Sequence, residues 1–317
     1  MSIKVGSVTE LFNHPSGIEP LEILMDKATV PVRFRHHPTS RILLISFHGA
    51  VNRETRVPPV FAPFLPGLGT SVAQLSVSDP SILLPGSFGM SWYSGHEGFN
   101  AQEILPKLFQ QIAEAGGYER VVFFGSSGGG FASLFYSSLM PGSVAIAQVP
   151  QTNMHQYYAG HILRYREGCW PSLGSNEELA DKICTDLCAW YSQPRPNTVI
   201  YLQSAGDHFH TRTQFAPFLD AISRVKQSRF IAHSSYWGRP GHSGAVTPDA
   251  YMPWVRAAIL SPSTEVDDLL STHYDLSSAM DQPVAASASA KEKPAAAHGI
   301  RMADMLRDFH LSQSKEV

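Results

Sequence analysis

The segment Gly125-Ser126-Ser127-Gly128-Gly129 has the residue types and the spacing of a serine nucleophile. It follows an apolar run and precedes a helical pattern over 131–139, so it is predicted to turn sharply from a strand into a helix. Such a turn exposes its middle residue and needs small residues two positions before and after, because strand and helix pass closely there. This spacing selects Ser127, since a register centred on Ser126 would place Phe124 at a crowded position.

A glycine cluster of this kind has two alternative explanations, a turn without chemistry and a phosphate-binding turn. The phosphate site would need a lysine as in G-K-[ST], or the pattern G-x-G-x-x-G, and neither is present in the cluster. The strand-turn-helix context favours the nucleophile. The backbone N–H of Gly128 would then lie at the N-terminus of the helix, directed at a developing oxyanion.

A serine hydroxyl needs a base, and the base needs a carboxylate that orients it. Among the 14 histidines, His242 is favoured because it lies in a loop of small residues between the last predicted strand and the last predicted helix. Asp207 is favoured as the acid because it follows the strand predicted over 198–203, at the edge where parallel sheets carry functional groups. Asp220 falls within a predicted helix, and Asp249 begins one, where it would cap.

Short apolar strands alternate with helices along most of the chain. This alternation predicts a mostly parallel α/β sheet with helices on both faces. The expected strands cover 41–47, 71–78, 119–124, 144–149, 198–203 and 229–233, and the expected helices cover 100–115, 131–139, 215–225 and 248–259.

These features together resemble the α/β-hydrolase superfamily, over roughly residues 30–262. The resemblance rests on the G-x-S-x-G turn, on the order nucleophile, acid, base along the chain, and on His48-Gly49 after an early strand. In that superfamily the loop after this strand donates the second oxyanion N–H, which implies the backbone of Ala50 or Val51. We take Ala50; the further glycines of the lipase HGGG pattern are absent. The His48 side chain is expected to pack against the nucleophile turn.

Two segments depart from the alternation of strands and helices. Residues 151–196 are too long for a plain connection and rich in aromatic residues, so we expect a helical insertion that acts as a lid. The catalytic domain is then predicted to cover 1–262, and 263–299 to form a linker. Residues 300–317 are predicted to form an amphipathic helix that docks on its own domain or binds a partner. Its apolar positions are Met302, Met305, Leu306 and Phe309.

Three further residues are candidates for substrate contacts. Trp92 and Tyr93 either line an acyl or sugar pocket together with the aromatic residues of the insertion, or pack in the core. Arg53 lies just beyond the oxyanion loop, where it either holds an anionic group of the substrate or is solvated.

The cysteines and histidines do not predict a metal site. Cys184 and Cys188 are spaced as on one helix face, but no C-x2-C pair accompanies them. His208 and His210 lie beside Asp207, yet the triad explains that aspartate better. We therefore expect neither a metal nor another cofactor.

The composition limits the kinds of partner. A net charge of -3, with 16% charged residues, gives no basic field, so nucleic acid is not an expected partner. No apolar run reaches the ~18–20 residues of a membrane span, and the first ten residues lack the apolar region of a signal peptide. We therefore expect a cytoplasmic protein without a membrane span. Its expected partners are a small-molecule or carbohydrate ester and, through the terminal helix, a second copy or another protein.

Three functions fit these features. The first is hydrolysis of an ester through an acyl-serine intermediate, as in a carboxylesterase or a deacylase. The second is acyl transfer, in which an alcohol or amine intercepts the same intermediate. The third is a catalytically silent hydrolase-like module that works through its lid and its tail. The complete triad counts against the third, and the side chains do not separate the first two.

Overall fold

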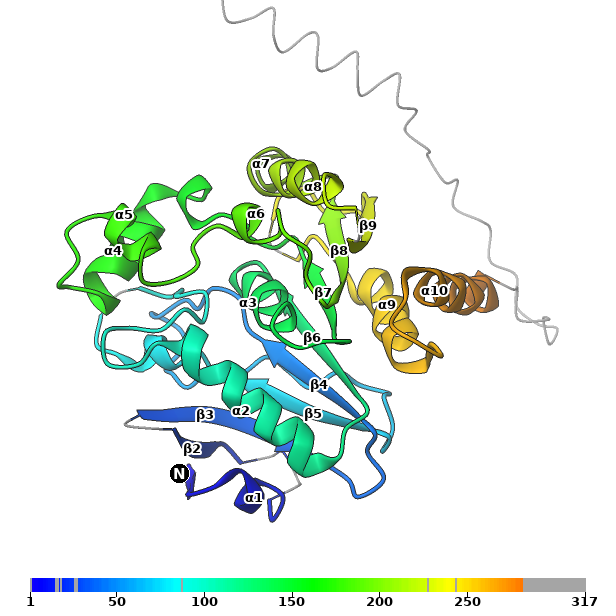
Figure 1. Cartoon of the computed structure of the whole chain (residues 1–317), viewed down its shortest axis with the longest axis horizontal. Coiled ribbons are helices and arrows are strands. Elements are labelled where there is room, and N and C mark those ends of the chain that lie inside the picture. Colours follow the sequence, from blue (N-terminus) through cyan, green and yellow to red (C-terminus); the bar gives the residue numbers. More distant parts are fainter. Residues whose placement is uncertain are drawn as a thin grey trace, which may run out of the picture. The chain divides into compact units, whose positions relative to one another are not determined.

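A nine-stranded sheet forms the centre of the described part of the computed structural model (Figure 1). The strand order is β1-β2-β3-β5-β4-β6-β7-β8-β9; from β5 to β9 all neighbours are parallel, whereas β3 is antiparallel to both β2 and β5. The structure describes residues 2–14, 17, 19–25, 28–86, 88–226, 228–242 and 244–281. The strands are β1 (Ile3–Val5), β2 (Leu21–Met25), β3 (Ala28–Arg35), β4 (Ile42–Phe47), β5 (Val72–Val77), β6 (Arg120–Ser126), β7 (Val144–Gln148), β8 (Thr198–Ser204) and β9 (Arg229–Ser235).

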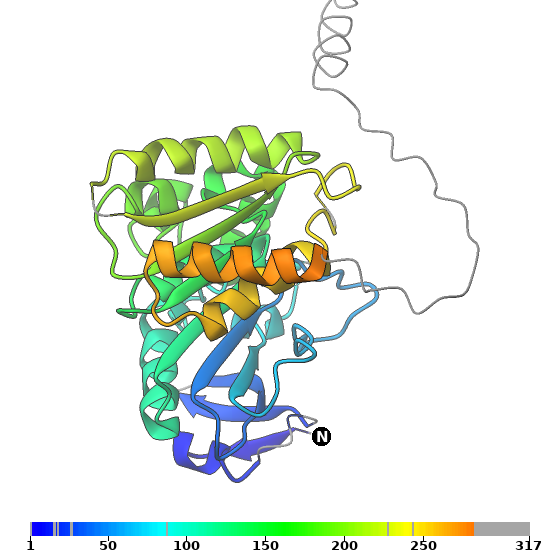
Figure 2. The ribbon, with the colours of Figure 1, turned by 90° about the vertical axis from the view of Figure 1, so that its right-hand side faces the viewer.

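Helices connect these strands and cover both faces of the sheet (Figure 2). They are α1 (Val8–Leu11), η1 (Pro80–Leu83), α2 (Ala101–Gly116), α3 (Gly128–Ser137), η2 (Met154–Gln156), α4 (Ala159–Cys169), α5 (Asn176–Ala180), α6 (Leu187–Trp190), α7 (His208–His210), η3 (Thr211–Phe215), α8 (Ala216–Ser223), α9 (Pro248–Leu260) and α10 (Val266–Asp281).

The central strands are apolar at almost every position because each of their faces contributes to a separate core. In β6, Val121 and Phe123 join the core formed with α2, α3 and α8. The residues between and after them, Val122 and Phe124, join the opposite core with α9 and with Leu269 of α10. A strand buried on both faces reads as a continuous apolar run rather than an alternating one.

The predicted mostly parallel α/β sheet is therefore confirmed. Each strand expected between residues 41 and 233 is present, with ends shifted by at most two residues. The sequence did not indicate β1, β2 and β3, which extend the sheet beyond β5. The segment 151–196 is helical over η2, α4, α5 and α6, as expected. Its action as a lid stays a prediction.

The linker predicted over 263–299 needs a correction, because α10 occupies its first half. Leu269 is fully buried in the core beneath α9, and His273 stacks on Trp254 of α9 with ring centroids 3.6 Å apart. Figure 2 shows α10 lying against α9 on one face of the sheet. The remainder of that linker, from residue 282, and the helix predicted over 300–317 lie outside the described residues.

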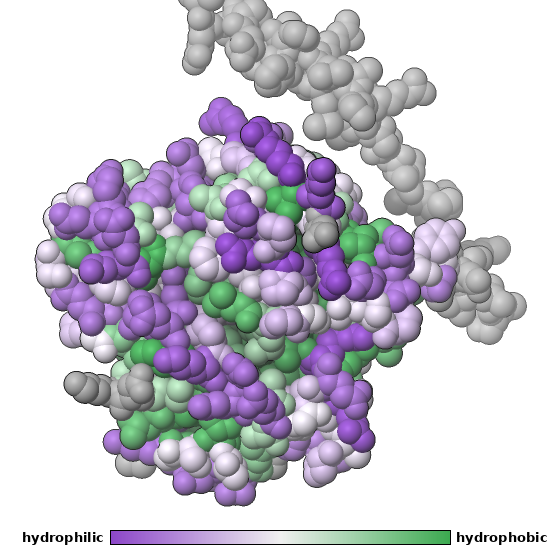
Figure 3. Space-filling view, in the orientation of Figure 1, coloured by the Kyte–Doolittle hydropathy of each residue, from purple (hydrophilic) through white to green (hydrophobic). Residues whose placement is uncertain are grey.

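Within the described ranges, no helix combines the length and the apolar character that crossing a bilayer requires. Hydrophilic residues cover most of the face drawn in Figure 3, with smaller hydrophobic areas between them.

Candidate active site

Ser127 occupies the sharp turn between β6 and α3. Its φ of 57° and ψ of -120° are rare for a residue with a side chain, and such strained backbone is concentrated at functional sites. The flanking glycines are required by close packing: a Cβ on Gly125 would lie 2.2 Å from the carbonyl oxygen of Gly129, and a Cβ on Gly129 would lie 2.6 Å from that of Phe47. The small-residue spacing used to choose Ser127 thus has a direct steric cause.

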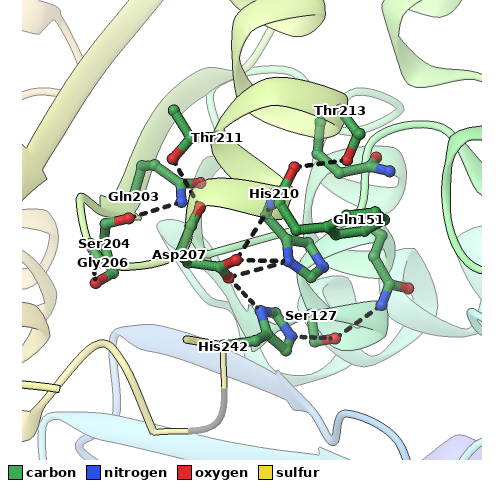
Figure 4. A network of polar contacts seen from close by, with 12 residues as sticks. Ser127, Gln151, Gln203, Ser204, Gly206, Asp207, His210, Thr211, Thr213 and His242 are labelled. Carbon is green, nitrogen blue, oxygen red and sulfur yellow. Dashed lines mark hydrogen bonds and ion pairs between the residues drawn. The ribbon is translucent and has the colours of Figure 1, made fainter. Parts of the chain in front are cut away.

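A continuous chain of hydrogen bonds joins the three residues proposed as a triad (Figure 4). Nε2 of His242 lies 2.9 Å from Oγ of Ser127, and Nδ1 lies 2.7 Å from Oδ2 of Asp207. Asp207 follows β8 and caps α7, and its side chain is buried, whereas the His242 side chain is 27% exposed. The turn after β6, the end of β8 and the loop before α9 thus meet at the C-terminal edge of the sheet.

A second histidine that the sequence did not assign to the site, His210, also binds Asp207. Nδ1 of His210 lies 3.0 Å from each carboxylate oxygen of Asp207, and its ring stacks on His242 with centroids 3.8 Å apart. Burial alone would raise the pKa of Asp207, but the hydrogen bonds from His210 and His242 outweigh it and hold that pKa well below its usual range. Burial lowers the pKa of His210, which favours its neutral form.

Asp207, His210 and His242 are close enough to be considered as metal ligands, since one atom of each lies within 4.8 Å of the others. However, the two imidazole rings are stacked, with their planes only 12° apart and their centroids 3.8 Å apart. Each nitrogen lone pair lies in the plane of its own ring, so one ion cannot lie in both planes at the usual metal–nitrogen distance of about 2.1 Å. The hydrogen bonds account for this cluster better, and the absence of a metal stays an expectation.

The loop after β4 lies directly against Ser127. A Cβ on Gly49 would be 3.7 Å from Cβ of Ser127. The N–H of Val51 already donates to the carbonyl of Gly89 at 2.7 Å. Among the described residues, neither the Ala50 nor the Gly128 N–H donates to another protein group. Of the two candidates in this loop, Ala50 is therefore the one free to bind an oxyanion.

The His48 side chain belongs to the support of this loop. Its Nε2 accepts a hydrogen bond from the N–H of Asp79 at 3.2 Å, and its Nδ1 lies 2.6 Å from the carbonyl oxygen of Gly49. Burial lowers the pKa of His48, although the neighbouring Gly49 carbonyl and Asp79 oppose this. The ring fixes the path of the chain beside Ser127.

Of the two alternatives for Trp92 and Tyr93, the structure favours packing in the core over lining a substrate pocket, because each is only 1% exposed. Both residues have positive φ angles, 51° and 58°, in a turn beneath the site. The Tyr93 hydroxyl accepts from the N–H of His48 at 2.8 Å and donates to Val77. Arg53 donates to the carbonyl of Ile82, and its contact with a substrate remains untested.

The buried residue that holds this turn is Asp79, which sequence reasoning missed. Its carboxylate accepts from the hydroxyl of Ser91 and from the N–H of Tyr93, both at 2.7 Å, and from the N–H of Ser81 at 3.1 Å. The only sequence signal was its position just after β5, at the same sheet edge as the proposed triad.

Gln151 is the second residue at the site that sequence reasoning missed, and it contacts Ser127 itself. Its Nε2 donates to Oγ of Ser127 at 2.9 Å, while its Oε1 accepts from the indole N–H of Trp92. Gln151 follows β7, the neighbour of β6 in the sheet. Its position after a central parallel strand could have suggested a functional role.

No family model matches the chain, and no curated protein matches it. Solved structures, in contrast, match it. Dipeptidyl peptidase 4 of Porphyromonas gingivalis superposes with a TM-score of 0.53 at 14% identity, over 76% of this chain and 34% of that one. Acylaminoacyl peptidase of Pyrococcus horikoshii gives 0.52 at 10% identity, over 84% and 46%. The capsule O-acetyltransferase of Neisseria meningitidis serogroup A gives 0.50 at 13% identity, over 70% and 92%.

The two peptidases are much longer than the region they share with this chain, which spans 34% and 46% of their lengths. At these identities the similarity concerns the architecture. The chain has the α/β-hydrolase fold, as its sheet and these neighbours show.

Proposed function

We propose that this protein is a serine hydrolase that cleaves an ester through an acyl-serine intermediate. The observation that carries the proposal is the unbroken hydrogen-bond chain from Oγ of Ser127 through His242 to Asp207, built on a strained turn. An intact chain of this kind counts against a catalytically silent module.

The geometry supports a two-step reaction. As Oγ of Ser127 attacks the ester carbonyl carbon, its proton passes to Nε2 of His242, and the carbonyl electron pair moves onto the oxygen. The N–H groups of Gly128 and Ala50 are proposed to bind that oxyanion. The intermediate then releases the alcohol, which takes the proton from His242. Water repeats the sequence: His242 accepts its proton and returns it to Oγ as the acid leaves.

An aromatic row beside the proposed triad replaces Trp92 and Tyr93 as the candidate substrate surface. The ring of Tyr157 lies 5.7 Å from His210 and 4.8 Å from Tyr158, which stacks parallel to Phe209 at 4.6 Å. Tyr158 is 54% exposed. Exposed aromatic faces pack well against the C–H groups of a sugar ring or an acyl chain. We therefore infer that the substrate is a carbohydrate ester or a similar small ester, and that nucleic acid is not a partner.

Acyl transfer is the second candidate function. It is favoured by the similarity to the capsule O-acetyltransferase, because this chain covers 92% of that protein, whereas it covers less than half of either peptidase. The same acyl-serine would then be attacked by a hydroxyl group of an acceptor in place of water.

Labelling with a fluorophosphonate, followed by mapping of the modified residue, tests the proposal. We expect label on Ser127 and turnover of short p-nitrophenyl esters. Ser127→Ala should abolish both, with kcat falling on the order of 10⁶-fold. Ser126→Ala is the matched control and should keep both. Label that persists in Ser127→Ala would refute the assignment. Adding a sugar acceptor and measuring acylated sugar against free acid separates transfer from hydrolysis.

A further inference from the structure

Gln151 is placed to act on the nucleophile, and nothing in the triad mechanism above requires it. Its side chain is fully buried. The positive φ of Val149, 36°, turns the chain at the end of β7, and the N–H of Gln151 then donates to the carbonyl of Ser127 at 3.2 Å. Backbone and side chain of Gln151 therefore both hold the same serine.

The orientation of the Gln151 amide follows from its partners. An indole N–H can only donate, so the atom that faces Nε1 of Trp92 must be the amide oxygen. The amide NH₂ must then face Oγ of Ser127, 2.9 Å away. Because the Gln151 NH₂ has no acceptor lone pair to offer, the serine hydroxyl cannot donate back to it. The hydroxyl proton is left to point at Nε2 of His242.

The Trp92 side of this contact is rigid. Trp92 is 1% exposed and lies in the turn that Asp79 holds through the N–H of Tyr93. The hydroxyl of Tyr136 adds a hydrogen bond to the carbonyl of Tyr93 at 2.6 Å. The donor that fixes the Gln151 amide thus cannot readily turn away.

We propose that Gln151 is a further catalytic residue, whose amide N–H directs the Ser127 proton to His242 and stabilises Oγ whenever that oxygen carries negative charge. This inference rests on the proposed function. Gln151 transfers no proton: during attack the proton passes from Oγ to Nε2 of His242, and during release of Oγ it returns. The N–H donation strengthens as charge develops on Oγ, which lowers the barrier of each step.

The two half-reactions should depend on Gln151 to different extents. Before acylation Oγ is a hydroxyl oxygen that already accepts this hydrogen bond well. In the acyl-enzyme it is an ester oxygen, which is a poorer acceptor. The hydrogen bond from Gln151 therefore strengthens more when Oγ leaves than when it attacks. Loss of the donor should therefore slow deacylation more than acylation.

Gln151→Met, which keeps the length of the side chain and removes the donor, provides the test. We expect fluorophosphonate labelling of Ser127 and p-nitrophenyl acetate turnover to slow by about tenfold to a hundredfold. Acetyl-Ser127 should accumulate during turnover, as measured by intact-protein mass spectrometry. Gln102→Met is the matched control: it removes a buried amide that binds Ser94 and Cys184 instead. It should leave labelling, turnover and acyl-enzyme level unchanged.

If the methionine variant does not fold, Gln151→Glu is the second variant. Glutamate keeps the shape of the glutamine side chain and an oxygen that accepts from the Trp92 indole N–H. Its second oxygen would compete with His242 for the serine proton, so labelling should fall at least as far. Wild-type labelling and turnover rates in a folded Gln151 variant would overturn the inference and leave the proposed function intact. Failure of the wild-type protein to be labelled at Ser127 would instead overturn the proposed function.

Discussion

Asp207 distinguishes this site at the scale of single residues, because its carboxylate serves two stacked imidazoles. The hydrogen bonds from His210 and His242 stabilise the charged carboxylate and keep it ionised to low pH. A carboxylate, which only accepts, requires a proton on Nδ1 of both histidines. For His242 that leaves Nε2 free to accept the proton of Ser127.

Asp207→Asn should reverse the direction of one of the hydrogen bonds between this side chain and the two imidazoles. The amide NH₂ of asparagine would donate to one imidazole, which favours the wrong tautomer of His242. We expect kcat for ester hydrolysis to fall by about 10⁴-fold, as in other triads, with the fold retained. Steady-state kinetics together with circular dichroism would measure this. Asp249→Asn, at the first turn of α9, is the control. Normal activity in Asp207→Asn, with a loss in Asp249→Asn, would move the acid into that helix.

At the scale of elements, five of the six strands that the sequence predicted, β4 to β8, are buried on both faces, and the sixth is the edge strand β9. Runs such as Val121 to Phe124 are apolar at every position because two cores need them. β1 to β3 were missed because β1 has three residues, β2 alternates in burial, and β3 contains Pro31. α10 was missed because its composition is polar and, among its described side chains, only Leu269 is buried.

The difference between local patterns and tertiary contacts also explains which residues of the candidate site could be predicted. Ser127, Asp207 and His242 follow from a local motif and from positions just after a strand or before a helix. Gln151 contacts Ser127 and Trp92, which are 24 and 59 residues away along the chain, and its contact with Ser127 depends on strand order. Asp79 accepts hydrogen bonds from Ser91 and Tyr93 in the loop that follows it, and no local pattern gives the path of that loop. The strand order β4-β6-β7, which brings Gln151 beside Ser127, cannot be predicted from any local sequence pattern. The two alternatives for Trp92 could not be separated from the sequence, because an aromatic residue near a site gives the same pattern whether it lines a pocket or supports one.

The docking of α10 on α9 should weaken on acidification. Burial, and then the nearby His233, lowers the pKa of His273 to about 4. His273 stacks on Trp254, whose indole N–H donates to Nδ1 of His233 at 2.8 Å. Between about pH 6.5 and 4 the unfolded chain binds a proton that folded His273 does not. Its contribution to stability is therefore present above pH 6.5 and lost as the pH falls towards 4.

His273→Phe keeps the stacked ring and removes the titration. Its free energy of unfolding should fall less than that of the wild type between pH 7 and 4.5, by about 1 kcal/mol after allowance for the partial exposure of the ring. Urea titrations at both pH values would measure the difference. His208→Phe, which replaces an exposed histidine, is the control. Parallel pH dependences for the wild type and His273→Phe would contradict this prediction.

At the scale of the whole molecule, the segment after residue 262 completes the core that Val122 and Phe124 of β6 form with α9. The Thr198 hydroxyl in β8 donates to the carbonyl of Thr264 at 2.6 Å. Arg229 in β9 pairs with Glu265 at 2.8 Å. Leu269 then enters the core beneath α9. The strands that carry Asp207 and lead towards His242 are therefore tied to residues that the sequence assigned to a linker.

A chain ending at residue 281 should therefore behave differently from one ending at 262. The shorter chain loses a buried leucine, the ring stacked on Trp254 and the hydrogen bond to Thr198, and we expect unfolding to be easier by about 3 kcal/mol or more. The chain ending at 281 keeps every contact named above, so its melting temperature and fluorophosphonate labelling of Ser127 should match those of the full chain. Thermal unfolding and labelling of the three proteins side by side would test this. If residues 1–262 proved as stable and as reactive as 1–281, α10 would be a dispensable appendage. If 1–281 lost activity, the chemistry would depend on residues after 281, although the proposed triad lies wholly before them.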